Sequence, residues 1–148
     1  MRFADCVPLL FFDPVLRAVG TAHAGWRGTM QNVLGSVVSA MQQAFGSRAA
    51  DIRVVIGPSI GPCCYQVGEG IFEAAKNAFK DPSPFFARQE NGLYFDLWQA
   101  NLRQAQEAGV TRIVSSQLCT ACNTRHFFSH RAEKGKTGRF ATFIGLSE

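Results

Sequence analysis

The sequence predicts an α+β domain in which helices cover a layered, mixed β-sheet. Two patterns indicate this class: the apolar segments that suit strands are short and outnumber the helices, and the helices carry apolar residues at helical spacing on one face. The 148 residues are 47% hydrophobic, which is enough to bury a core in a chain of this length. The sequence contains no linker, repeat or low-complexity tract, so we expect a single domain over residues 1–148.

The first half of the chain predicts a hairpin, a long helix and a buried strand. Val7–Phe12 is a continuous apolar strand, an Asp-Pro pair turns the chain, and Arg17–Ala22 returns as the second strand. The helix should begin after Thr29, a good N-cap residue, and end at Gly46. Ile52–Ile56 then reads as a buried strand.

The second half predicts two helices among short strands. The helices span about Ile71–Phe79 and the residues from Asp96, the expected N-cap, to Ala108. The expected strands are, in order, Leu93–Phe95, Val110–Ser115, and a pair formed by Phe127–Ser129 and Phe140–Leu146.

The bulk features favour a reduced, cytoplasmic protein. The longest apolar run, Val7–Phe12, is too short to span a bilayer, and the N-terminus shows no signal-peptide pattern. Five cysteines is an odd number, which disfavours a disulfide framework. We therefore expect free thiols and no membrane partner.

Cys6 and His23 flank the predicted hairpin, one before its first strand and the other after its second. In an antiparallel pair these positions fall at the same end, so the thiol and the imidazole should come within reach of one another. Three interpretations fit: a buried cysteine with a hydrogen-bonded core histidine, a nucleophile with its base, or a zinc site with an open position for water. The pattern alone leaves all three open.

The segment from Gly25 to Thr29 is a glycine-punctuated turn that leads into a helix. Backbone N–H groups at a helix N-terminus favour an anion, and the planar guanidinium of Arg27 suits phosphate. Trp26 and Arg27 also fit ordinary packing and a solvated surface charge. The net charge of +4, with scattered Lys and Arg, hints at a small anionic substrate and argues against a nucleic-acid partner.

The other four cysteines favour structural burial over a metal or redox site. Cys63 and Cys64 are adjacent, so their side chains should diverge in an extended backbone. Cys119 and Cys122 form a single C-x-x-C, where a zinc knuckle needs two such pairs. We therefore expect these thiols to be reduced and to form no closed zinc site.

Several longer segments together resemble one known family. They are ADCVPLLFFDP, AVGTAHAGWRGT, IGPSIGPCCYQVG, FDLWQANLRQAQEAGV and CTACNTRHFFSHRAEKGKTGRFATFIGL. From Ala4 to Leu146 the sequence is similar to the bacterial YfiH-like, laccase-domain family, and the combination of ADC, HAGWRG and KTGR is specific. Members of that family were called polyphenol oxidases and later purine nucleoside phosphorylases.

The resemblance implies a cysteine-hydrolase-like (YfiH-like) α+β fold and an enzyme that phosphorolyses adenosine, inosine and methylthioadenosine and also deaminates adenosine. It implies a zinc site that uses Cys6 and His23, with a third ligand from a Q-x-H-G motif upstream. Zinc with an open position lowers the pKa of its water, which then attacks the purine. For the phosphate, Arg27 is the first candidate and Arg131 and Arg139 are the others.

The sequence contains no Q-x-H-G motif. We therefore expect the N-terminal part of the family pattern to be missing, through truncation, a separate chain or a divergent short form. The missing segment or a partner chain would supply the third ligand, and His126 and His130, near Arg131, are the local substitutes. Alone, the chain should hold zinc weakly and turn adenosine over poorly.

Three other functions stay open. The family's earlier description implies copper-dependent oxidation of phenols. A blue-copper site needs two histidines with a cysteine, and the three histidines of the chain are few for a multicopper cluster, so this function ranks lower. A metal-free hydrolase would use Cys6 and His23 as nucleophile and base. A non-catalytic remnant would bind nucleotides or a partner.

Overall fold

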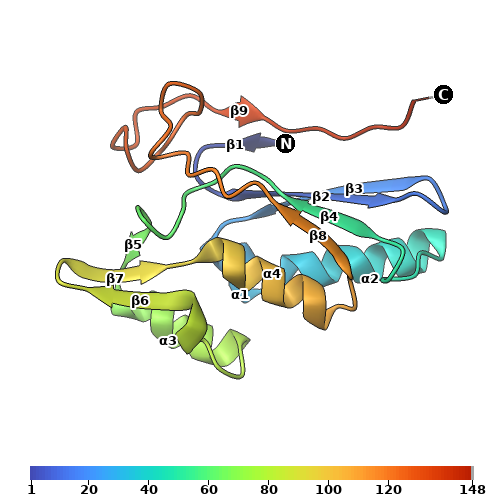
Figure 1. Ribbon diagram of the computed structural model, residues 1–148, viewed down its shortest axis with the longest axis horizontal. Helices are drawn as coiled ribbons and strands as arrows, with labels where there is room; N and C mark the ends of the chain where they lie inside the picture. Colours follow the sequence, from blue (N-terminus) through green and yellow to red (C-terminus); the bar gives the residue numbers. More distant parts are fainter. Residues whose placement is uncertain (148) are drawn as a thin grey trace.

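The structure is a computed structural model that describes residues 1–147, and a four-stranded sheet lies at its centre (Figure 1). The strands, in spatial order, are β3 (Ala18–Ala24), β2 (Val7–Asp13), β4 (Arg53–Ile56) and β8 (Arg112–Ser115). β2 runs antiparallel to both β3 and β4, whereas β4 and β8 are parallel. The predicted mixed sheet is therefore confirmed.

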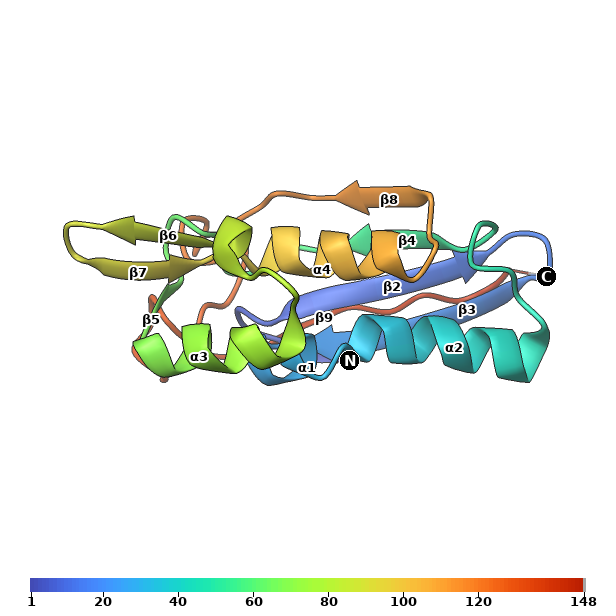
Figure 2. The ribbon, with the colours of Figure 1, turned by 90° about the horizontal axis from the view of Figure 1, so that it is seen from below.

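Helices cover one face of this sheet, as Figure 2 shows most clearly for α2 (Val33–Phe45) and α4 (Leu97–Glu107). The short helix α1 (Trp26–Met30) follows β3, and α3 (Glu69–Ala78) packs beside it. A 3₁₀ turn, Ser83–Phe85, follows α3 and leads into the hairpin of a small second sheet. Within residues 1–147, no helix has the length and apolar character needed to cross a membrane.

Two smaller sheets complete the described chain. One has the order β5–β7–β6, formed by Gln66–Val67, Gly92–Phe95 and Phe86–Gln89. The other pairs β1 (Arg2–Phe3) with β9 (Phe140–Ala141). In Figure 1 this pair lies on the opposite side of the central sheet from the helices.

The predicted pairing of residues 127–129 with residues 140–146 is wrong. Phe140 pairs instead with Phe3, and residues 127–129 form no strand. The reason lies in the loop between them, where the backbone N–H of Ser129 and the hydroxyl of Thr137 both donate to the carboxylate of Glu133. These bonds close the loop on itself, so it cannot extend as a hairpin.

The predicted helix from Thr29 to Gly46 divides in two, because the chain turns at Asn32. Asn32 has a left-handed backbone (φ 51°), and its side chain accepts a hydrogen bond from the Gly35 N–H at 3.1 Å, so Asn32 is the N-cap of α2. Thr29 is buried within α1 and is not the cap. The predicted stop at Gly46 is confirmed, with φ 75°.

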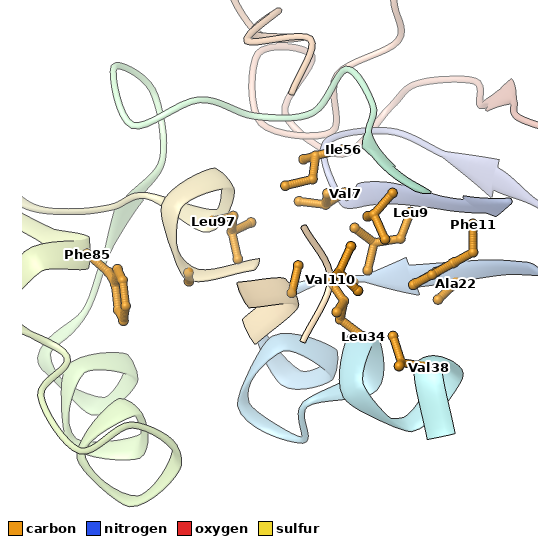
Figure 3. Close-up of a cluster of buried hydrophobic side chains, with 14 of the residues drawn as sticks. Val7, Leu9, Phe11, Ala22, Leu34, Val38, Ile56, Phe85, Leu97 and Val110 are labelled. Carbon is orange, nitrogen blue, oxygen red and sulfur yellow. The ribbon is translucent and has the colours of Figure 1, made fainter. Parts of the chain in front are cut away.

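Alternate residues of β2 supply the centre of the core. Val7, Leu9 and Phe11 are completely buried and point toward the helices, as the two-residue period of a strand requires. Figure 3 shows them packed against residues from the neighbouring strands and helices. These partners include Ala22, Leu34, Val38, Ile56, Leu97 and Val110. This packing holds the ends of β2 and β3, where the candidate site lies.

Asp96 is the N-cap of α4, as the sequence predicts, because its carboxylate accepts a hydrogen bond from the Gln99 N–H at 3.0 Å. Asp96→Ala should lower the free energy of unfolding by about 1 kcal/mol. The matched control is Glu107→Ala, which removes the same charge at the other end of α4, where a negative charge gains nothing from the helix dipole. Urea denaturation measures both, and equal losses would contradict the capping role.

Candidate functional site

A cavity of about 420 Å³ opens at the end of the hairpin formed by β2 and β3. Its size suits a small-molecule site, since such pockets occupy about 300–1,000 Å³. The chemically active side chains in its walls come from segments far apart in the sequence. They are Asp5, Cys6, His23, Trp26, Tyr65, His130, Arg131 and Arg139.

The hairpin register places Cys6 and His23 at the same end of the sheet, where both line the cavity. Pro8 pairs with His23 and Val7 with Ala24, so Cys6, one residue before the strand, lies opposite Gly25. A Cβ atom on Gly25 would lie 2.9 Å from the Cys6 sulfur, closer than such atoms approach. The glycine therefore leaves the space that the thiol occupies at the cavity wall.

The surroundings of Cys6 and His23 favour their uncharged forms. Burial, and then the nearby carboxylate of Asp5, raises the pKa of the Cys6 thiol above its usual value. Burial lowers the pKa of His23, whose ring stacks on Phe3 with 4.6 Å between ring centroids. Without a metal, the pair is therefore poorly suited to form the thiolate and imidazolium that a cysteine hydrolase uses.

Arg131 and Arg139 bring positive charge to the cavity without a carboxylate partner among residues 1–147. Arg131 Nη1 donates to the carbonyl of Gln66 at 2.9 Å, and its guanidinium lies 5.4 Å from the centroid of the Tyr65 ring. Arg139 Nη1 donates to the Gly138 carbonyl at 2.7 Å. Each guanidinium has five N–H donors, so both keep donors for an anion.

Arg27 and His126 do not line this cavity, whereas His130 does. The guanidinium of Arg27 lies over the ring of Trp26, 4.5 Å from its centroid. The structure thus leaves these two residues outside the cavity. It brings together five other residues that the sequence singled out, namely Cys6, His23, His130, Arg131 and Arg139.

Asp5 and Tyr65 are site residues that the sequence reasoning did not single out. Asp5 is 8% exposed and has a left-handed backbone, with φ 85°. Its carboxylate accepts hydrogen bonds from the Thr120 hydroxyl and from the Arg131 N–H, both at 2.7 Å. Asp5 therefore fastens two distant loops to the residue that precedes Cys6. The position of Asp5 directly before the candidate cysteine is the sequence feature that could have identified it as a site residue.

Asp5→Ala should lower the free energy of unfolding by about 3 kcal/mol, because it leaves the buried Thr120 hydroxyl and the partly buried backbone N–H of Arg131 without their acceptor. Asp5→Asn should have a smaller effect, since its amide oxygen can still accept from Thr120 while its NH₂ group faces the Arg131 N–H. Thermal unfolding measures the stability of each variant. The control is Asp51→Asn, because Asp51 is a half-buried aspartate far from Asp5 in the sequence. Equal stability of all three variants would contradict the fastening role.

The other four cysteines also lie together. The sulfurs of Cys63, Cys64, Cys119 and Cys122 lie within 4.8 Å of one another. The expectation that the adjacent pair diverges is wrong, because residues 62–64 form a turn and not an extended segment. All five cysteines of the chain have free thiols.

The donors at the cavity suit a metal ion in kind. Thiolate and imidazole are ligands for zinc and for copper, and Cys6, His23 and His130 all line the cavity. Within residues 1–147, however, the four-cysteine cluster is the only group of three or more such side chains with donor atoms within 4.8 Å of one another. Among the described residues, the thiol of Cys6 and the imidazoles of His23 and His130 therefore do not form a complete three-ligand site.

Comparisons with known proteins point to a single group. Residues 1–147 match the family model described as multi-copper polyphenol oxidoreductase laccase. The chain is 43% identical over 150 residues to purine nucleoside phosphorylase YlmD of Geobacillus stearothermophilus. This match covers 99% of this chain and 55% of that protein. The Bacillus subtilis protein of that name is 40% identical, and the match covers 99% of this chain and 54% of that protein.

The same group supplies a close structural match. The crystal structure of the hypothetical protein YfiH of Bacillus licheniformis has a TM-score of 0.88 and 43% identity, and the match covers 93% of this chain and 53% of that one. The expected YfiH-like fold is therefore confirmed. The chain spans about half the length of the curated relatives that it matches.

Proposed function

This chain belongs to the multi-copper polyphenol oxidoreductase laccase family, and on that premise we propose that it acts in the phosphorolysis of purine nucleosides and the deamination of adenosine. The matched relatives from Geobacillus stearothermophilus and Bacillus subtilis are named purine nucleoside phosphorylases. We further propose that Cys6 and His23 hold a zinc ion, completed by a third ligand.

One observation carries this proposal. Within residues 1–147, one cavity is lined by a thiol, two imidazoles, two arginines without carboxylate partners, and two aromatic rings. These groups match the parts of a nucleoside phosphate reaction: a metal site, an anion site and apolar surfaces for a purine. They come from five separate segments of the chain, so their convergence depends on the fold.

Each group has a distinct part in the proposed reactions. Arg131 and Arg139 would hold phosphate by charge-assisted hydrogen bonds and place it against the ribose. The rings of Trp26 and Tyr65 would pack against the flat faces of the purine. A zinc ion held by Cys6 and His23 would supply Lewis-acid chemistry and an activated water for deamination.

Product analysis tests the two activities separately. The purified chain is incubated with zinc and adenosine, with and without phosphate. Phosphorolysis converts adenosine and phosphate into adenine and ribose 1-phosphate, whereas deamination converts adenosine and water into inosine and ammonia. We expect adenine only when phosphate is present, and inosine in both reactions.

The chain spans about half the length of its relatives, so an assay that detects no product is followed by a measurement of inosine binding at equilibrium. Phosphate should tighten the binding of inosine, because the proposal places the two ligands next to one another in one cavity, each with its own binding groups. The proposal is wrong if neither product forms and inosine binding is absent or independent of phosphate. Copper-dependent oxygen uptake with a phenol would favour the oxidase alternative instead.

A further inference from the structure

The four-cysteine cluster lies outside the walls of the cavity and has no part in the proposed reactions. Its sulfurs are already close: Cys64 Sγ lies 3.4 Å from Cys122 Sγ, and Cys63 Sγ lies 3.6 Å from it. A tetrahedral zinc ion with Zn–S bonds of about 2.3 Å keeps its sulfurs about 3.8 Å apart. The two sulfurs of a disulfide are only about 2.05 Å apart. The spacing therefore resembles that of sulfurs around one ion.

Two turns far apart in the sequence create this cluster. In the first, the backbone N–H of Cys64 donates to the Gly61 carbonyl at 3.0 Å, which curls the chain so that adjacent cysteines point to the same side. In the second, the Asn123 side chain donates to the Cys119 carbonyl at 2.8 Å. An isolated parallel bridge between Ser59 and Cys119 joins the two turns. The backbone thus positions all four sulfurs before any ion binds.

Cys119 has the surroundings of a metal-bound thiolate. Its sulfur accepts a hydrogen bond from the Gly61 N–H at 3.2 Å, and such bonds orient and stabilise ligating sulfurs. Gly61 cannot carry a side chain here, because a Cβ would lie 2.6 Å from the Trp98 ring. Cys119 is 6% exposed, whereas Cys63 and Cys122 are exposed. An ion could therefore enter from the surface and be held at the buried end.

We propose that Cys63, Cys64, Cys119 and Cys122 bind one zinc ion in a closed four-thiolate site that is separate from Cys6 and His23. Four sulfur ligands in a compact tetrahedral group select zinc or an iron–sulfur centre. Four protein ligands leave no open position for water, so the role of this ion is structural. Binding releases the thiol protons to solvent, since the ligands are thiolates.

This zinc ion fastens a loop that carries part of the cavity wall. The carbonyls of Cys64 and Gln66 accept hydrogen bonds from Arg131 Nη1 at 3.3 and 2.9 Å. Tyr65, between them, lines the cavity. Removal of the ion should therefore loosen Tyr65 and Arg131 without removing any cavity side chain.

Native mass spectrometry of zinc-loaded protein tests the assignment. The wild-type chain and the matched control Cys6→Ser should each retain a tightly bound zinc ion, whereas Cys122→Ser should lose it, with a dissociation constant raised by more than about 100-fold. Retention by Cys122→Ser together with loss in Cys6→Ser would overturn the proposal. This readout does not depend on enzymatic activity, so the proposed function and the zinc site can fail separately.

A measurement on the wild-type chain covers the case in which the variant does not fold. Zinc-loaded protein is alkylated with iodoacetamide before and after addition of a chelator, and the modified cysteines are mapped. The four cluster cysteines should react only after chelation. Their rapid alkylation in the zinc-loaded protein, before any chelator is added, would overturn the proposal.

Discussion

Replacing Cys6 with alanine is expected to lower the rate at which the chain converts adenosine into products by at least about 100-fold. Loss of a group that only supports a metal ligand already lowers affinity or activity about 10–100-fold, and Cys6 is proposed as a ligand itself. The fold should survive, because the thiol is only partly buried and alanine fits beside Gly25. Circular dichroism and product analysis together measure the effect.

His23→Ala should have an effect of similar size, and the two losses should not add, because each variant removes the same ion. His126→Ala is the matched control, since His126 is exposed and lies outside the cavity lining. Unchanged turnover in Cys6→Ala, or equal losses in the two histidine variants, would contradict the assigned site.

The central sheet and the helix after Asp96 were predictable because their signals are local. The apolar run that became β2 suits a buried strand, and the Asp-capped helix begins and ends close to the expected residues. The hairpin also places Cys6 and His23 at one end of the sheet, where both line the cavity. The hairpin and the capped helix depend on residues that are near one another in the sequence.

The errors arise where contacts between distant residues decide the structure. β9 pairs with β1, more than 130 residues away, and the sequence pattern of β9 did not specify that partner. Thr29 looks like a helix cap, but the side chain of Asn101 donates to its hydroxyl at 3.1 Å inside the core. The helix instead divides at Asn32, whose left-handed backbone and side chain cap α2.

The cysteine cluster was missed for a local reason. The expectation of divergent side chains at Cys63 and Cys64 assumed an extended backbone, although the preceding Gly-Pro pair signals a turn. A turn at these residues directs both sulfurs to one side, where the C-x-x-C pair completes the group. The second C-x-x-C expected of a zinc knuckle is replaced here by two adjacent cysteines.

Removing the guanidinium of Arg139 should raise the KM for phosphate by about 10–100-fold, because a charge-assisted hydrogen bond contributes about 1.5–3 kcal/mol. Arg139→Met suits the test because its Nη1 bonds go only to the carbonyls of the two residues that precede it, Thr137 and Gly138. Arg112→Met, an exposed residue of β8 outside the cavity lining, is the matched control. Initial rates over a range of phosphate concentrations give KM and kcat separately.

Arg131 should behave differently from Arg139, because it binds both the proposed phosphate and the loop that carries Tyr65. Arg131→Met should therefore raise the KM for phosphate and lower the melting temperature, whereas Arg139→Met should change KM alone. Arg131→Lys keeps the charge but loses the fork of donors, so it should restore part of the phosphate affinity and little of the stability. A lower melting temperature with an unchanged KM in both methionine variants would show that these arginines only support the fold, and the anion site would have to lie elsewhere.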